Sequence, residues 1–166
     1  MTDAQLIAQC LSNNRLAQKK LYDRYKTAMY TLAYRICDDF GLAEEVLQDA
    51  FLKVFRYLHT FRQESTLGAW IKRIVVRTAY KKVKKLVRFE PIDHEVKEAI
   101  DWGDSLDTDY LEKAIQALPE GYRMVFVLVE VEGYSHREVG DLLGISAGTS
   151  KSQLFYAKKK LRAMIR

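Results

Sequence analysis

Basic side chains that can bind phosphate are concentrated in two segments of this 166-residue chain. Residues 53–88 hold eleven lysines and arginines against one acidic residue, and residues 151–166 hold six and none. Residues 89–112 reverse this pattern, with nine acidic residues and one basic residue. A single basic block is equally well a solvated helix face, but two blocks flanking an acidic segment favour two surfaces that bind nucleic acid.

The sequence lacks the residue patterns that catalysis, metal binding and nucleotide binding need. His59, His94 and His136 are dispersed and have no metal-ligand spacing, and neither a phosphate-binding glycine loop nor a nucleophile with an identifiable base is present. We therefore predict that the protein is not an enzyme, needs no metal or cofactor and takes no small-molecule substrate. Cys10 and Cys37 are too few for a disulfide framework, which predicts reduced thiols in a cytoplasmic protein. The sequence has no apolar run of membrane-spanning length and no visible secretory signal, so we expect no membrane insertion.

The composition predicts an all-α protein. The chain has only 8 glycines and 2 prolines, whereas an all-β protein needs many turns. Apolar residues recur at three- and four-residue spacing, as on one face of a helix. We predict two small helical domains, residues 1–88 and 110–166, joined by an acidic linker at 89–109. The expected helices run from a cap at Thr2 to about residue 11, and over about 15–37, 43–58, 67–87, 110–117, 120–131, 136–143 and 147–164.

The segment from Ser135 to Ser146 has the caps and turn residues of a helix-turn-helix. Ser135 and Glu138 have the spacing of a capping box, and Ser146 can cap the helix that follows. Gly140 is small where two helices approach closely, and Gly144 can adopt the positive φ of a sharp turn. We therefore predict that the C-terminal domain is a helix-turn-helix, the arrangement that places a helix in the major groove of DNA.

The helix expected at 147–164 would be the recognition helix of that motif. Its first turns carry small, hydrogen-bonding side chains that suit base edges, and its later lysines suit phosphates. The alternative is a plain helical hairpin with a lysine-rich solvent face. Spacing, caps, turn glycine and charge together favour the DNA-binding interpretation.

Three stretches of the sequence resemble one bacterial family. They are AEEVLQDAFLKVFRYLHTF at 43–61, FRQESTLGAWIKRIVVRTAYKKVKK at 61–85 and LPEGYRMVFVLVEVEGYSHREVGDLLGISAGTSKSQLFYAKKKL at 118–161. In this order they resemble the extracytoplasmic-function (ECF) sigma factors, the minimal two-domain branch of the sigma-70 family. The resemblance implies a protein that binds core RNA polymerase and directs promoter recognition, melting and transcription initiation. It also implies an anti-sigma factor as a partner, because family members are commonly held by one.

The first stretch resembles the helix with which the family docks on the polymerase. Glu45, Gln48 and Asp49 share one helix face by their i, i+3, i+4 spacing and fall on the family's contact positions. Phe51 and Leu52 would extend that patch or pack the core. The core-polymerase-binding set implied by the resemblance is Glu45, Gln48, Asp49, Phe51 and Leu52.

The second stretch resembles the family's promoter-melting loop and helix, which meet the minus-ten element. Opening the duplex requires that a base be pulled from the stack and held, at a cost of a few kcal/mol that pocket contacts and phosphate neutralisation offset. Trp70 falls on the apolar stripe and is expected in the core, whereas Tyr80 is the more plausible exposed aromatic. Arg77 stands where the family often has asparagine, which favours phosphate or guanine contact. The implied minus-ten set is Arg62, Glu64, Ser65, Thr66, Lys72, Arg73, Arg77, Tyr80, Lys81 and Lys84.

The third stretch resembles the family's region 4, which reads the minus-thirty-five element in duplex DNA. The implied contacts are Thr149, Lys151, Ser152, Phe155, Tyr156, Lys158 and Lys159. The family commonly has valine at Ser150 and arginine at Tyr156, and a tyrosine cannot grip guanine with two parallel hydrogen bonds. Two other functions stay open from the residues: an autonomous repressor or activator, which would bind duplex tightly by itself, and an adaptor such as an anti-sigma factor, which would not stimulate transcription.

Overall fold

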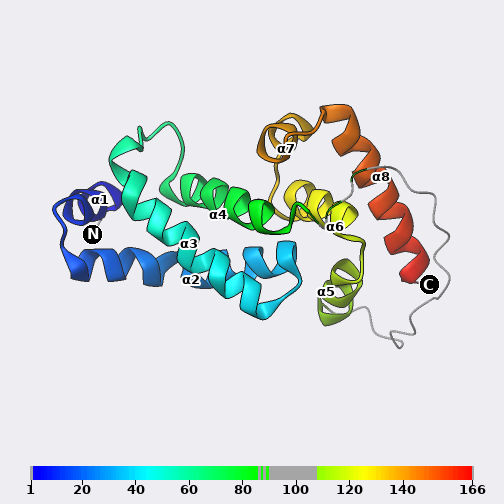
Figure 1. Ribbon diagram of the computed structural model, residues 1–166, viewed down its shortest axis with the longest axis horizontal. Helices are drawn as coiled ribbons and strands as arrows, with labels where there is room; N and C mark the ends of the chain where they lie inside the picture. Colours follow the sequence, from blue (N-terminus) through cyan, green and yellow to red (C-terminus); the bar gives the residue numbers. More distant parts are fainter. Residues whose placement is uncertain (1, 86, 88, 90–107, 166) are drawn as a thin grey trace. The chain divides into compact units, whose positions relative to one another are not determined.

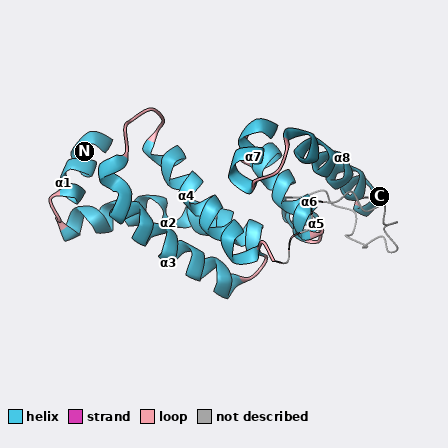
Figure 2. Ribbon diagram, turned by 45° about the horizontal axis from the view of Figure 1, so that its top comes forward, coloured by secondary structure: helices cyan, strands magenta, loops and turns pink. Residues whose placement is uncertain are grey.

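The computed structural model describes residues 2–85, 87, 89 and 108–165, and every regular element in this part of the chain is helical (Figures 1 and 2). The all-α prediction is confirmed. The chain divides into two compact units, Met1–Lys82 and Val83–Arg166. Most of the predicted acidic linker, with Trp102, lies outside the described residues.

The N-terminal unit consists of four α-helices and one short 3₁₀ helix. Helices α2 and α3 lie side by side, and the inner face of α4 contributes Ile71 and Val75 to a core that also holds Leu21, Ile36 and Val46 (Figure 1). Burial of such aliphatic side chains contributes about 1.5–3 kcal/mol each. The elements are α1 (Asp3–Leu11), α2 (Arg15–Cys37), α3 (Phe40–Tyr57), η1 (Leu58–Thr60) and α4 (Leu67–Val83).

Side-chain caps fix where these helices begin. Thr2 and Gln5 form the predicted capping box at α1, with hydrogen bonds of 3.2 and 3.0 Å. The Oδ1 atom of Asp39 accepts a 2.8 Å hydrogen bond from the backbone N–H of Leu42. Helix α3 therefore begins at Phe40, three residues before the predicted start, and Gly41 lies inside its first turn. Helix α4 ends at Val83 and not at residue 87.

The C-terminal unit is built from α5 (Thr108–Gln116), α6 (Glu120–Phe126), α7 (His136–Leu143) and α8 (Ala147–Met164). Residues Val127–Val131 continue α6 as a π-helical turn, η2, within the range predicted as one helix. Helices α6 and α8 pack against each other (Figure 1). Leu118 and Val125 are buried in the core of this unit.

A buried arginine ties α5 to α6. The Arg123 side chain is 2% exposed and pairs with Glu120 of the same helix. Its guanidinium also donates to the backbone oxygens of Leu118, at 3.0 Å, and Gln116, at 3.4 Å. These bonds satisfy the buried charge and the carbonyls at the end of α5 together, which makes Arg123 a structural residue of this unit.

The described residues contain no helix that is long and apolar enough to cross a membrane. Within the same part of the chain, no three histidine, cysteine, aspartate or glutamate side chains come together in a way that could hold a metal ion.

Candidate functional site

The outer face of α3 carries the carboxylates predicted to dock on the polymerase. Glu45 and Gln48 are exposed and Asp49 is half-buried. Lys82 of α4 places its Nζ atom 2.8 Å from Asp49 Oδ2 and 3.9 Å from Glu45 Oε2. The hydrogen bond with Asp49 and the two negative charges raise the pKa of Lys82. Lys82 of the same unit thus pairs with part of the acidic face, and the sequence did not indicate this contact.

The two apolar residues of the predicted docking set have different positions. Phe51 is 3% exposed, and its ring meets Tyr22 edge-on with 5.0 Å between centroids. The Phe51 side chain packs the core, which is one of the two roles expected of it. Leu52 is 70% exposed, which is unusual for leucine in a folded unit and suits an apolar contact with a partner.

A cleft of about 510 Å³ separates the outer faces of α3 and α4. The Nζ atom of Lys53 lies in it and donates a 3.3 Å hydrogen bond to the hydroxyl of Thr78, which in turn donates to the backbone oxygen of Ile74. Lys53 and Lys82 were both missed by sequence reasoning as residues of this surface. The lining residues are Asp49, Leu52, Lys53, Thr78, Lys81 and Lys82.

The loop between η1 and α4 forms a small pocket of about 170 Å³. Gln63 turns the loop with a φ of 58°. The rings of Phe61 and Trp70 lie at one side, with 5.4 Å between centroids, and Trp70 is half-buried instead of enclosed in the core as expected. The structure brings together three of the loop residues predicted for minus-ten contact. The lining residues are Thr60, Phe61, Arg62, Glu64, Ser65 and Trp70.

Thr66, the fourth loop residue predicted to contact DNA, has a local role. Its Oγ1 atom accepts a 3.1 Å hydrogen bond from the backbone N–H of Ala69, as a helix cap does. Thr66 is not among the residues that line the pocket. It fixes the start of α4 and, through it, the position of Trp70 at the pocket's edge.

Helix α4 presents Arg73, Arg77 and Lys81 on the face opposite its buried residues, whereas Lys72 lies one turn before the buried Val75 and Val76 and is at the edge of the buried face. Arg77, Lys81 and the following Lys84 are exposed, and Lys72 and Arg73 are half-buried. Tyr80 is half-buried as well, and burial raises the pKa of its hydroxyl. Tyr80 and Trp70 are thus equally half-buried, and of the two Trp70 is the one that lines the pocket.

The helix-turn-helix geometry of the C-terminal unit confirms the motif. Ser135 and Glu138 form the capping box with hydrogen bonds of 3.1 and 3.2 Å. Gly144 ends α7 with a φ of 68°, in the left-handed region that favours glycine. A Cβ atom on Gly140 would lie 2.6 Å from the backbone oxygen of Ile145, so the close approach needs a residue without a side chain. Ser146 then caps α8 through the N–H of Thr149, at 3.0 Å.

Helix α8 exposes part of the predicted recognition set. Lys151, Phe155 and Lys159 share one side by their i, i+4, i+8 spacing, and Phe155 is 62% exposed. Thr149 and Ser152 are half-buried near the start of the helix. This side combines two cations with one apolar ring, which suits phosphates and a thymine methyl group.

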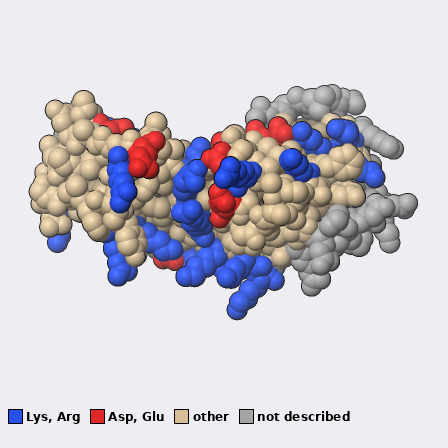
Figure 3. Space-filling view, turned by 90° about the horizontal axis from the view of Figure 1, so that it is seen from above, with Lys and Arg blue, Asp and Glu red and all other residues tan. Residues whose placement is uncertain are grey.

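Two further residues of the predicted recognition set, Tyr156 and Lys158, contact other side chains of the C-terminal unit. Tyr156 stacks on Tyr122 of α6 with 6.2 Å between ring centroids, and Lys158 pairs with Glu130 at 2.8 Å. On the inner side of α8, Ser150 is fully buried and its hydroxyl lies 2.7 Å from His136 Nδ1. Serine at the position of the family's valine therefore gains a hydrogen bond with α7. Figure 3 shows lysine and arginine at the surface of both units, several of them beside acidic side chains.

Comparison with protein families decides between the functions that the residues left open. Residues 21–89 match the family model described as Sigma-70 region 2, and residues 108–161 match Sigma-70, region 4. The chain belongs to the sigma-70 family. A sigma factor acts in transcription initiation through RNA polymerase and promoter DNA and is not itself an enzyme, which confirms the predicted function.

Similar proteins lie in the ECF branch of the family. The chain is 27% identical to the ECF RNA polymerase sigma factor SigM of Mycobacterium tuberculosis, over 99% of this chain and 85% of that protein. It is also 27% identical to the ECF RNA polymerase sigma-E factor of Escherichia coli K12, over 97% of this chain and 93% of that protein. The predicted membership of the ECF sigma factors is confirmed.

Solved structures share the fold. The sigma factor RpoE of Bartonella quintana, in complex with the anti-sigma factor NepR, superposes with a TM-score of 0.61 at 23% identity, over 89% of this chain and 95% of that one. CnrH, in complex with the cytosolic domain of CnrY, gives a TM-score of 0.60 at 24% identity, over 98% of this chain and 96% of that one.

Proposed function

We propose that the sigma factor divides its work between its two units. Residues 1–88 dock on core RNA polymerase and capture the minus-ten element, residues 110–166 read the minus-thirty-five element, and residues 89–109 join them. The observation that carries this assignment is the pocket at Phe61, Arg62, Glu64, Ser65 and Trp70, which opens beside the basic helix α4. A base pocket next to cations that neutralise phosphate is what strand capture requires.

The pocket would hold one unstacked base of the minus-ten element. The rings of Phe61 and Trp70 offer a stacking surface, which contributes about 1–3 kcal/mol per base and so offsets the cost of unstacking. Glu64 and Ser65 can hydrogen-bond to base edges, and Arg62 can bind the backbone. The strand would be held by its phosphates along α4 and at Lys84 just after it, with Tyr80 supporting the helix. The residues of α4 proposed for this are Lys72, Arg73, Arg77 and Lys81.

The docking surface would be the acidic face of α3. Glu45, Gln48 and Asp49 supply polar contacts, and the exposed Leu52 supplies an apolar one next to them. In the second unit, Lys151, Phe155 and Lys159 would face the minus-thirty-five duplex, with Thr149 and Ser152 at the base edges. Tyr156 and Lys158 would support this side of α8 through their contacts with Tyr122 and Glu130.

Run-off transcription with purified core polymerase and a promoter library tests the proposed function. We expect initiation at a subset of sequences, weak duplex binding by the free protein and strong binding only by the complex with core. Tight duplex binding by the free protein would indicate an autonomous repressor or activator. Absence of initiation from every sequence would overturn the proposal.

A Gln48→Ala, Asp49→Ala double substitution should weaken core binding at least about tenfold, because it removes one hydrogen-bonding group and one charge from the docking face. Both side chains lie on the outer face of α3, so the circular dichroism spectrum should not change. The matched control is Gln9→Ala with Asp23→Ala, which removes the same side-chain types from α1 and α2. Core affinity equal to wild type in the first double variant would remove the docking assignment.

Substituting both Lys151 and Lys159 by alanine should reduce the salt dependence of minus-thirty-five binding. Each lysine that contacts a phosphate adds about one unit to the slope of log affinity against log salt, so the slope should fall by about two. Lys113→Ala on α5 is the control and should leave the slope unchanged. A wild-type slope in the double variant would show that neither lysine contacts a phosphate.

We further propose that the protein works in the cytoplasm and is held inactive by an anti-sigma factor. Membership of the sigma-70 family, whose members act on RNA polymerase and promoter DNA, supports the location. The similar folds of RpoE and CnrH were solved with the anti-sigma factor NepR and with the cytosolic domain of CnrY, respectively, which supports a proteinaceous inhibitor here.

A further inference from the structure

We propose that Lys82 is an intramolecular competitor for the docking face of α3 and lowers the affinity of this sigma factor for core polymerase. The inference rests on the proposed docking role of Glu45 and Asp49. By this inference, a lysine of α4 helps to set the affinity of the chain for core polymerase.

The position of Lys82 on α4 directs it toward α3. It follows Thr78 by one turn, and Thr78 is 3% exposed and receives the Lys53 hydrogen bond from α3. The Lys82 side chain is 27% exposed, and its Nζ atom reaches Asp49 Oδ2 at 2.8 Å. The lysines and arginines proposed to hold promoter DNA are other residues, so Lys82 is separate from that set.

The ion pair occupies an oxygen that a polymerase cation would need. Two carboxylates carry a charge of −2, and Lys82 reduces the charge of the group to −1. Asp49 is 48% exposed and Glu45 is 66% exposed, so their field reaches the solvent over a Debye length of roughly 10 Å. A basic partner therefore meets a weaker attraction and must displace an ammonium group from Asp49 before it can bind there.

The same exposure means that the ion pair contributes little to folding. Exposed pairs contribute about 0.2–1 kcal/mol to stability, and α3 and α4 are held by buried aliphatic residues such as Val46 and Val75. A Lys82→Met variant keeps an unbranched apolar side chain that is one heavy atom shorter, and it removes the charge. It should fold like the wild type, which makes its binding constants interpretable.

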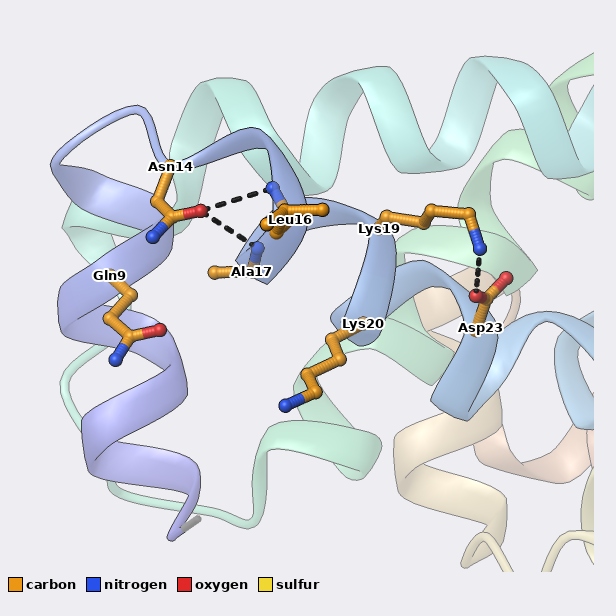
Figure 4. Close-up of a pocket in the computed structure, with 7 residues that line it drawn as sticks. All are labelled: Gln9, Asn14, Leu16, Ala17, Lys19, Lys20 and Asp23. Carbon is orange, nitrogen blue, oxygen red and sulfur yellow. Dashed lines mark hydrogen bonds and ion pairs between the residues drawn. The ribbon is translucent and has the colours of Figure 1, made fainter.

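The test compares core affinity of the full-length wild type and Lys82→Met at about 0.1 M and about 0.5 M salt. We expect the variant to bind core about threefold more tightly at the lower concentration, chiefly through faster association, and equally at the higher one. The control is Lys19→Met, which removes a lysine from a second Lys–Asp pair of the same 2.8 Å length, Lys19–Asp23, on α2 (Figure 4). This control should bind core as the wild type does.

A second comparison links the effect to the carboxylates. In a Glu45→Gln, Asp49→Asn background, Lys82→Met should no longer raise the affinity for core, because no charge is left to unmask. Equal or weaker binding of the single variant, with the wild type binding core normally, would overturn this inference alone. A wild type that does not bind core at all would overturn the proposed docking function and this inference with it.

Discussion

Replacing Gly140 by alanine is expected to lower the free energy of unfolding of the C-terminal unit by about 2–3 kcal/mol, as overpacking at a site that cannot relax does. The new Cβ atom would lie 2.6 Å from the backbone oxygen of Ile145. Neither atom is the end of a flexible side chain, so α7 and the start of α8 must move apart. The shift also strains the 3.1 Å hydrogen bond from the Ile145 N–H to the Gly140 oxygen.

Thermal melting of the full-length protein, followed by far-ultraviolet circular dichroism, measures this effect. The matched control is Gly148→Ala, because a Cβ atom there meets only the Ser146 Oγ at 3.8 Å. Alanine is the better helix former, so the control should raise stability by up to about 1 kcal/mol. Minus-thirty-five binding should fall in Gly140→Ala and persist in Gly148→Ala. Equal melting of the two variants would contradict the close approach that defines this helix-turn-helix.

The parts of the structure that the sequence predicts well are those set by local chemistry. The predicted ranges 136–143 and 147–164 match the observed α7 and α8. The reason is that Ser135 and Ser146 cap backbone N–H groups, and Gly144 ends a helix, within a few residues of their own positions. Helix α3 begins before the predicted start because the Asp39 side chain caps it and Gly41 is accommodated in its first turn. The resemblance to a family then assigned roles that spacing alone left open.

The parts that the sequence did not predict depend on contacts between distant residues. Lys82 and Asp49 are far apart in the chain, and no periodicity indicates that they meet. Phe51 and Leu52 are neighbours of similar hydrophobicity, yet one is buried against Tyr22 and the other is exposed, because α2 covers only one of them. Trp70 lies on an apolar stripe, and only the path of the 61–66 loop leaves it beside a pocket.

A Trp70→Ala variant should form open promoter complexes about 5- to 150-fold less well, which corresponds to the loss of about 1–3 kcal/mol of base stacking. Trp70 is half-buried at the pocket and is the larger of its two aromatic rings. Without it, an unstacked base meets Phe61 alone and returns more readily to the duplex. Core affinity should stay at the wild-type value, because the docking face is on α3.

Trp70→Phe is the matched variant, since it keeps an aromatic ring against Phe61 and should retain most of the activity. Comparing a duplex promoter with one that is mismatched across the minus-ten element separates capture of the base from damage to the fold. A base that is already unpaired no longer has to be extracted, so the defect of Trp70→Ala should shrink on the mismatched template. An equal defect on both templates, together with a lowered melting temperature, would show that Trp70 only supports the packing of α4. A reduced defect, with unchanged core affinity, would instead assign the ring to extraction and capture of the base from the duplex.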